Sequence, residues 1–430
     1  MSVSVRDTRS AELYARALQY LPGGVNSPVR AMRAIGRDPI FAERASGGEL
    51  TDVDGNRYVD WMCSWGPLIL GHAHPAVLEA VTAAAAGGTT FGAATAGEVD
   101  LAEEVSRRMP AVEMLRMTSS GTEATMSAIR LARAATGREK LLKFAGAYHG
   151  HVDGLLADAG SGLATQGIPA SPGVTAAAAA ATVVVPWNNP EAVAAACAAH
   201  EFAAILAEPY PANMGLVLPE SGFLEHLRDQ ATANGALLLF DEVISGFRVA
   251  PGGAQELTGV TPDLVVMGKI IGGGLPAAAY GGPRALMERI APAGDVYQAG
   301  TLSGNPLAVA AGLATLAELD EGAYLRLSAI TEQLAEGLRQ AAREWAGGAV
   351  SIVTAPGLLT VFFSAEPPRD YEQARRCDLD AFGAWCRGLL ARGVYPPPAQ
   401  FEAWFPSLAH TPEHIDITVE AAAAAFAELG

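Results

Sequence analysis

The chain has 430 residues, of which half are hydrophobic and 17% are charged, so it can bury a large interior and is not mainly disordered. At roughly 150 residues per domain, this length predicts two or three packed units. Acidic side chains outnumber Lys and Arg by 46 to 29, and the formal net charge of −17 repels phosphate backbones and anionic lipid surfaces. We therefore expect neither a nucleic acid nor a membrane as a partner.

Cysteine and histidine usage points to a reducing compartment and to no metal. The 4 cysteines lie far apart without C-x-x-C spacing, which favours free thiols over a disulfide framework or a zinc site. No signal peptide or membrane span is visible in the sequence, so a cytoplasmic location is expected. The pairs His72/His74 and His149/His151 have no acidic or thiol cluster beside them, so no metal site is predicted.

Residues 1–69 read as an N-terminal segment. A helical pattern runs from Leu13 to Leu21, and a run of turns follows it. The stretch from Thr51 to Asp60 predicts a hairpin, because Asp-Gly-Asn lies between two alternating strands.

Residues 70–320 alternate between strand and helix patterns. The apolar runs 203–206, 236–240 and 264–267 are short, uninterrupted and bounded by turn residues, which is typical of strands buried on both faces of a parallel sheet. Helical stretches such as 220–234 lie between them. This part of the chain therefore predicts a doubly wound α/β domain.

Residues 321–430 predict a smaller α+β domain, with helices at 323–345, at 379–392 and from residue 413 onward. Between residues 154 and 182 lies a Gly-, Ala-, Ser- and Pro-rich stretch with almost no charge, too long for an ordinary connection. We expect it to be a closing lid, with a disordered spacer as the alternative.

A lysine and an aspartate each follow a predicted buried strand, where ligands bind in open α/β sheets. Lys269 alone could be a lysine that extends into solvent, and its surroundings lack the glycine spacing of a nucleotide P-loop. Asp241 alone could cap the following turn. Together they are the two groups that pyridoxal phosphate requires: a Schiff-base lysine and an anion that keeps the pyridine nitrogen protonated.

A phosphate cradle is expected at residues 115–123, which read as a strand, a small-residue turn and a helix start. The free N–H groups of such a helix end attract an anion. Ser120 and Glu123 also have the spacing of a capping box, which can coexist with phosphate binding. Downstream, Tyr148 could cover one face of a cofactor ring, although a lone loop tyrosine is more often ordinary packing.

The stretch Asp241–Arg248, with Lys269 following 28 positions after the aspartate, resembles the class III aminotransferases of PLP fold type I. Further blocks narrow the resemblance to the glutamate-1-semialdehyde 2,1-aminomutases, from about residue 10 to the C-terminus. These blocks are PGGVNSPVR (22–30), WGP (65–67), GHAHP (71–75), YHGH (148–151), GSG (160–162), NMG (213–215) and GTLSGNP (300–306). The resemblance implies a large domain with a mostly parallel, doubly wound sheet, and a small α+β domain formed by the N- and C-terminal segments.

The resemblance also implies roles for individual residues. Lys269 is expected to be the Schiff-base lysine and proton shuttle, Asp241 the partner of the pyridine nitrogen, and Tyr148 the residue that stacks on the ring. The remaining cofactor contacts are expected from Ser120, Gly121 and Thr122 at the phosphate, Thr301 of the neighbouring subunit, Asn213 near the ring hydroxyl, and His149 and Val243. The substrate contacts are expected from Arg30, which suits a carboxylate by bidentate pairing, and from Trp65, Ser161 and Glu402.

The implied activity is conversion of glutamate-1-semialdehyde to 5-aminolevulinate, a step of tetrapyrrole (porphyrin) biosynthesis. It uses pyridoxal phosphate and its pyridoxamine form, and no outside amino donor. The resemblance also implies a homodimer with shared active sites. A related ω- or β-amino acid transaminase is the alternative, and a non-catalytic cofactor-binding protein is a remote one. The residues Tyr210-Pro211-Ala212 depart from the family pattern and leave the fine shape of the substrate site open.

Overall fold

The computed structural model describes residues 6–156 and 171–429. Residues 157–170 of the stretch expected to form a lid, Ser161 among them, lie outside the described residues. None of the described helices combines the length and the apolar character needed to cross a bilayer.

The larger unit is built on a seven-stranded sheet in the order β4-β10-β9-β8-β7-β5-β6. Strands β6, β5, β7, β8 and β9 pair in parallel, whereas β10 is antiparallel to both β9 and β4. The strands are β4 (Met114–Thr118), β5 (Lys140–Phe144), β6 (Thr182–Val185), β7 (Phe202–Ala207), β8 (Leu237–Glu242), β9 (Leu264–Met267) and β10 (Ala278–Gly282). The mostly parallel sheet and the three buried runs predicted from the sequence are confirmed.

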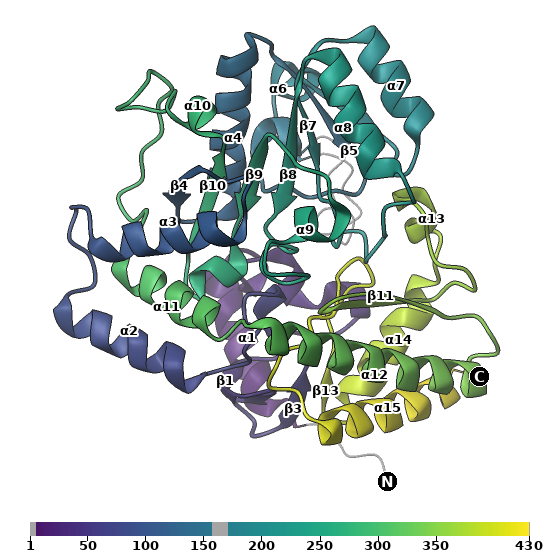
Figure 1. Cartoon of the computed structure of the whole chain (residues 1–430). Helices are drawn as coiled ribbons and strands as arrows, with labels where there is room; N and C mark the ends of the chain where they lie inside the picture. The colour runs from purple at the N-terminus through teal and green to yellow at the C-terminus, as the bar shows by residue number, and fades with distance from the viewer. Residues whose placement is uncertain (1–5, 157–170, 430) are drawn as a thin grey trace.

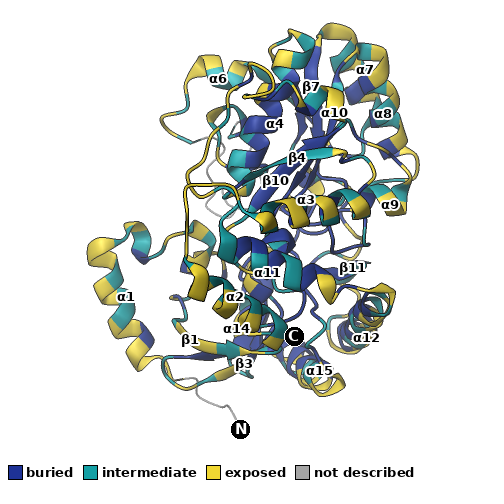
Figure 2. Cartoon of the chain, turned by 60° about the vertical axis from the view of Figure 1, so that its left-hand side comes forward, coloured by how far each residue is buried: buried dark blue, intermediate teal, exposed yellow. Residues whose placement is uncertain are grey.

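Helices cover both faces of this sheet because successive side chains of a buried strand point to opposite sides. On β8, Leu239 packs in the cluster that contains residues of α4 (Gly121–Thr136), whereas Leu238 and Phe240 pack with α8 (Phe223–Asn234). Figure 2 shows the strands as the buried centre between helices with exposed outer faces. The other helices of this unit are α2 (Pro75–Gly87), α3 (Ala96–Arg108), α6 (Ala176–Ala180), α7 (Pro190–Ala199), α9 (Ala254–Thr258), α10 (Arg284–Met287) and α11 (Pro306–Ala317).

The smaller unit contains both ends of the chain, which are the purple and yellow segments in the lower part of Figure 1. Its four-stranded sheet has the order β1-β2-β3-β13, and β13 pairs in parallel with β3. The strands are β1 (Ala42–Ser46), β2 (Glu49–Asp52), β3 (Arg57–Asp60) and β13 (Val394–Tyr395), and a separate hairpin consists of β11 (Ser351–Ala355) and β12 (Leu358–Phe362). The predicted hairpin at 51–60 is confirmed as the β2–β3 pair. The small α+β unit formed by the two ends of the chain is also confirmed.

Four helices of the smaller unit lie where helical patterns were predicted: α1 (Thr8–Tyr20), which begins five residues earlier than expected, α12 (Glu321–Trp345), α14 (Leu379–Leu390) and α15 (Pro412–Ala427). The short helix α13 (Tyr371–Arg375) was not predicted. The core contains Trp61, Trp385 and Trp404, which pack with residues from both ends of the chain. The boundaries at 69/70 and 320/321 stay predictions.

A close approach of two backbones fixes the segment that carries Lys269. This segment, η6 (Lys269–Gly272), packs on α11 at Gly312, where an added Cβ would lie 2.0 Å from the Ile271 carbonyl oxygen. Only a glycine allows this contact without a shift of the backbone.

We therefore expect Gly312→Ala to lower the free energy of unfolding by about 1 to 3 kcal/mol, the usual range for overpacking a core. Chemical denaturation monitored by tryptophan fluorescence measures this loss. Gly87→Ala, in helix α2, is the matched control because its added Cβ meets nothing within 4 Å. An equal effect of the two changes would contradict this account.

Candidate active site

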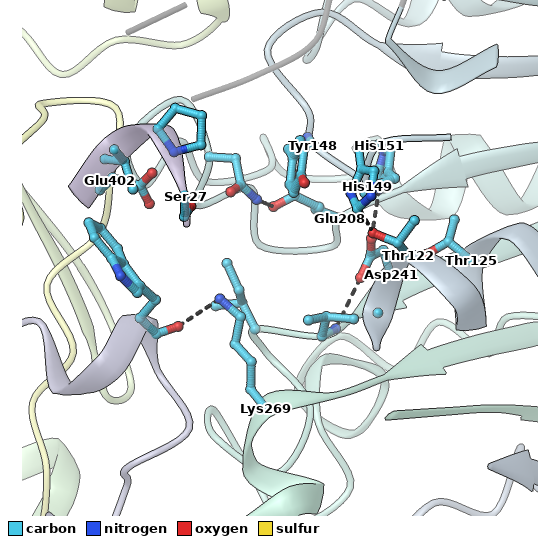
Figure 3. Close-up of a pocket in the computed structure, with 18 of the residues that line it drawn as sticks. Ser27, Thr122, Thr125, Tyr148, His149, His151, Glu208, Asp241, Lys269 and Glu402 are labelled. Atoms are coloured by element: carbon cyan, nitrogen blue, oxygen red, sulfur yellow. Dashed lines mark hydrogen bonds and ion pairs between the residues drawn. The ribbon is translucent and has the colours of Figure 1, made fainter. Parts of the chain in front are cut away.

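A cavity of about 700 Å³ lies at the carboxyl ends of the parallel strands, where the larger sheet meets the N- and C-terminal segments. Figure 3 shows Lys269 reaching into it between two groups of residues, with Asp241 and His149 on one side and Glu402 and Ser27 on the other. The lining residues are Asn26, Ser27, Pro28, Val29, Trp65, Gly121, Thr122, Thr125, Tyr148, His149, Gly150, His151, Leu156, Glu208, Tyr210, Asn213, Asp241, Val243, Ile244, Lys269 and Glu402.

Lys269 follows β9 and has a left-handed backbone, with φ of +51°. Its Nζ donates a hydrogen bond to the Trp65 carbonyl oxygen at 2.6 Å. Burial lowers the pKa of Lys269 to about 8, and the charge of Arg248 acts in the same direction, against the opposing effect of Glu402, Glu208 and Asp241. An amine with this pKa can both give and accept a proton near neutral pH.

Asp241 lies in the last two residues of β8, so the predicted strand extends further than the sequence indicated. Both of its carboxylate oxygens have a partner: Oδ2 contacts His149 Nδ1 at 2.8 Å, and Oδ1 accepts the Val243 N–H at 3.0 Å. The carboxylate is buried. These contacts fix its orientation at the edge of the cavity, with an anion available for a cationic ring nitrogen (Figure 3).

Glu208 directly follows β7 and holds two loops of the site. Its Oε1 accepts the Tyr148 N–H at 3.0 Å, and its Oε2 accepts the Asn213 Nδ2–H at 2.8 Å and the Ala212 N–H at 3.1 Å. Burial raises the pKa of Glu208, and the nearby Asp241 adds to this, whereas His149 opposes it. Tyr148 and Asn213 are therefore positioned through one buried carboxyl group.

The N-terminus of α4 opens toward the cavity. Ser120 caps the helix, since its Oγ accepts the Glu123 N–H at 3.3 Å, while Glu123 accepts the Ser119 N–H at 2.9 Å. The first N–H groups of a helix have no partner within it, and no described residue accepts those of Gly121 and Thr122. They are available to an anion such as a phosphate.

The donor set fits pyridoxal phosphate. This cofactor has an anionic phosphate, a cationic ring nitrogen and an aldehyde, so it needs three different partners around one cavity. The described residues supply them: the N–H groups of Gly121 and Thr122, the Asp241 carboxylate and the Lys269 amine. Within the described ranges 6–156 and 171–429, no three or more His, Cys, Asp or Glu side chains are grouped so that they could hold a metal ion.

The structure brings most of the predicted site residues to this cavity. Ten of them line it: Trp65, Gly121, Thr122, Tyr148, His149, Asn213, Asp241, Val243, Lys269 and Glu402. The roles given to them above stay predictions.

Three others do not line the cavity, and one is not described. Arg30 is exposed on η2 (Pro28–Ala31), directly after the lining residues 26–29. The Ser120 hydroxyl donates to Glu123 at 3.0 Å, and Thr301 is exposed in a separate segment. Ser161 lies outside the described residues. The roles of these four residues also stay predictions.

Sequence reasoning missed several lining residues, and Glu208 is the most important. A signal for it exists, because Glu208 follows a buried strand just as Lys269 does, and Ala207-Glu208 resembles Phe240-Asp241 in pattern. His151, Thr125 and Ser27 were also missed as lining residues; their positions depend on how loops and helices pack, which no local pattern specifies.

Comparison with known proteins places the chain in a family. The class-III aminotransferase family model matches residues 32–426. A glutamate-1-semialdehyde 2,1-aminomutase of Desulfatibacillum aliphaticivorans is 55% identical over 96% of this chain and 98% of its own length. The enzyme of the same name from Desulforudis audaxviator is 56% identical, with 97% of each chain covered.

Solved structures share the fold at lower identity. An omega-transaminase from Sphaerobacter thermophilus is 34% identical with a TM-score of 0.89, covering 97% of this chain and 96% of its own. A transaminase with PLP bound is 33% identical with a TM-score of 0.89 and 99% coverage of each chain. A variant of a glutamate-1-semialdehyde aminomutase from Pseudomonas aeruginosa PAO1 in complex with PMP is 29% identical with a TM-score of 0.87, covering 98% and 95%.

These matches extend over nearly the whole chain. The two relatives described above, each with more than 50% sequence identity, are both glutamate-1-semialdehyde 2,1-aminomutases. PLP fold type I is therefore the fold of this chain, and pyridoxal phosphate its cofactor. The chain belongs to the class III aminotransferase family, within the group of glutamate-1-semialdehyde 2,1-aminomutases.

Proposed function

We propose that the chain converts glutamate-1-semialdehyde to 5-aminolevulinate by intramolecular amino transfer, a step of tetrapyrrole biosynthesis. The proposal rests on three groups around one cavity: the Lys269 amine with a pKa of about 8, the hydrogen-bonded Asp241 carboxylate and the N-terminus of α4. It also rests on 55% identity to a named aminomutase. The enzyme is an isomerase, because the amino group leaves one carbon of the substrate and returns to its neighbour.

The cofactor, when bound, supplies an electron sink that stabilises negative charge on the carbon next to the transferred nitrogen. The chain supplies the surroundings of that chemistry. Gly121 and Thr122 bind the phosphate with their N–H groups, and Asp241 keeps the ring nitrogen protonated. Glu208 holds Tyr148 and Asn213 in place beside the ring.

Lys269 moves the proton. Its amine would carry the proton between the substrate carbon and the cofactor carbon, acting first as a general base and then as a general acid. A pKa of about 8 suits both steps, because neither the amine nor the ammonium form is rare near neutral pH. Ser27 and Glu402 lie on the side of the cavity away from Asp241, where the substrate chain would extend, and Trp65 also lines the cavity (Figure 3).

A transaminase activity is the second candidate, since the solved structures of transaminases have TM-scores of 0.89 to this chain. These proteins share about a third of their residues with the chain, whereas the named aminomutases share more than half. The higher identity favours the aminomutase.

A homodimer with shared active sites is part of the proposal. Apolar side chains are exposed on two adjoining segments: Phe91 on one, and Tyr297 and Leu302 on the other. Asn305 Nδ2 ties these segments together by donating to the Thr89 carbonyl oxygen at 2.9 Å. Exposed apolar patches of this kind mark interfaces, and Thr301 lies within the same region, so a second copy could present Thr301 to its neighbour's phosphate.

We also propose a cytoplasmic location, which the 4 free cysteines support.

The activity is tested with purified holoenzyme and glutamate-1-semialdehyde, without any other amine or oxo acid. We expect 5-aminolevulinate to form over many turnovers. Lys269→Ala should form none, because the amine proposed to move the proton is removed. A requirement for an added amino donor would instead identify a transaminase.

Arg30 is predicted to bind the substrate carboxylate. No described residue pairs with its guanidinium, and it directly follows the lining residues 26–29. Arg30→Lys keeps the charge but loses the two-pronged contact, so apparent substrate affinity should fall by about 1.5 to 3 kcal/mol, measured as a rise in KM. Arg33→Lys, an exposed neighbour, is the control and should leave KM unchanged. An unchanged KM in Arg30→Lys would assign the carboxylate to another residue.

The dimer is tested by sedimentation and by cofactor titration. We expect twice the monomer mass at micromolar concentration. Thr301→Ala should keep that mass but bind pyridoxal phosphate at least about 10-fold more weakly, the loss expected for one hydrogen bond of roughly 1.5 kcal/mol or more to a charged group. A monomer with full cofactor affinity would reject the shared site.

A further inference from the structure

A strained turn adjoins the catalytic lysine. Cys63, Ser64 and Trp65 have φ values of +44°, +58° and +69°, a left-handed backbone that costs energy in residues other than glycine. Asp60 holds the start of the turn, since its Oδ1 accepts the N–H groups of Met62 and Cys63 at 2.9 and 3.1 Å. Such strain persists only where surrounding contacts enforce it.

The turn presents two successive carbonyl groups to two cations. The Trp65 carbonyl oxygen accepts the Lys269 Nζ–H at 2.6 Å, and the Gly66 carbonyl oxygen accepts an N–H of Arg248. Gly66 has φ of +110°, and an added Cβ there would lie 2.9 Å from the Phe405 ring and 3.4 Å from the Lys269 side chain. The turn, the lysine and the ring therefore pack in direct contact.

Arg248 is fully buried. Besides Gly66, its guanidinium donates to the carbonyl oxygens of Gly357 at 3.0 Å and Pro406 at 3.1 Å. None of the carboxylates in the described ranges forms an ion pair with it. Both cations lie near Phe405, whose ring centre is 5.2 Å from Arg248 Cζ and 5.6 Å from Lys269 Nζ.

We propose that Arg248 is a positioning residue for Lys269: it fixes the strained turn whose carbonyl receives the free amine, and its uncompensated charge favours the neutral amine. Phe405 opposes the second effect, because the face of an aromatic ring stabilises a nearby cation.

Other charges around Lys269 act in the opposite direction. Glu402, Glu208 and Asp241 face it from three elements and favour the ammonium form, whereas Arg248 and burial favour the amine. Removing the charge of Arg248 must therefore raise the pKa of Lys269, and removing the ring of Phe405 must lower it. The opposite signs distinguish electrostatic positioning from a general loosening of the site.

The experiment uses the holoenzyme loaded with pyridoxamine phosphate, in which Lys269 is free. Trace acetylation with acetic anhydride between pH 6 and 10, followed by peptide mass analysis, gives the midpoint at which Lys269 becomes reactive. Arg248→Met should raise this midpoint by roughly half a pH unit or more, and Phe405→Leu should lower it. Arg248→Lys should restore the wild-type midpoint, since the charge remains.

The position of the amine is read separately. Arg248→Lys loses the contacts to the carbonyls of Gly357 and Pro406, so we expect a several-fold lower kcat with KM unchanged. Arg138→Gln is the matched control, because Arg138 also donates to backbone carbonyls, of Phe202 and Asn234, but away from the cavity. It should change neither the midpoint nor kcat.

An unchanged midpoint in both Arg248→Met and Phe405→Leu would make Arg248 a purely structural residue and overturn the proposal. If Arg248→Met does not fold, the midpoint of Phe405→Leu and the kcat of Arg248→Lys decide between the two outcomes. The proposal rests on the proton-transfer role of Lys269 in the proposed function. The labelling involves no substrate, so a failed aminomutase assay and a failed positioning role give different results.

Discussion

The site depends on the parallel pairing of three neighbouring strands. Because β7, β8 and β9 run in the same direction side by side, their carboxyl ends meet at one edge of the sheet. Each end delivers one ionisable side chain: Glu208, Asp241 and Lys269 in turn. Two carboxyl groups and an amine are thereby brought around one cavity without any contact between distant loops being needed.

Concentrating charge at a buried edge has a cost that the surroundings offset. Asp241 has His149 and a backbone N–H as partners, and Glu208 has three N–H donors. Among the described residues, Lys269 has one hydrogen-bond partner, a backbone carbonyl, beside an aromatic ring, so it has the fewest hydrogen bonds of the three. This inequality fits the proposed function, in which the lysine changes its protonation state while the carboxyl groups hold their partners in position.

Periodicity predicted the strands, the helices and the two principal site residues because these features are local. An uninterrupted apolar run specifies a buried strand, and a polar residue at its end marks the edge of the sheet, which sufficed for Lys269 and Asp241. Glu208 obeys the same rule and could have been found. The left-handed turn at 63–65 could not, since contacts with residues more than 180 positions away hold it in place. The antiparallel β10 was also outside the reach of local patterns.

The pairing of β13 with β3 has a consequence for the order of assembly on the ribosome. One edge of β3 pairs with β2, but its other edge pairs with β13, where Val59 and Asp60 lie opposite Val394 and Tyr395, and Phe405 donates its N–H to the Trp61 carbonyl oxygen. The sheet and core of the N-terminal segment can therefore be completed only after almost the entire chain has been synthesised. The larger sheet can form earlier, but the Trp65 carbonyl that accepts the Lys269 hydrogen bond belongs to the N-terminal segment. A nascent chain can therefore form the strands of the larger sheet before the hydrogen bond of Lys269 to Trp65 is in place.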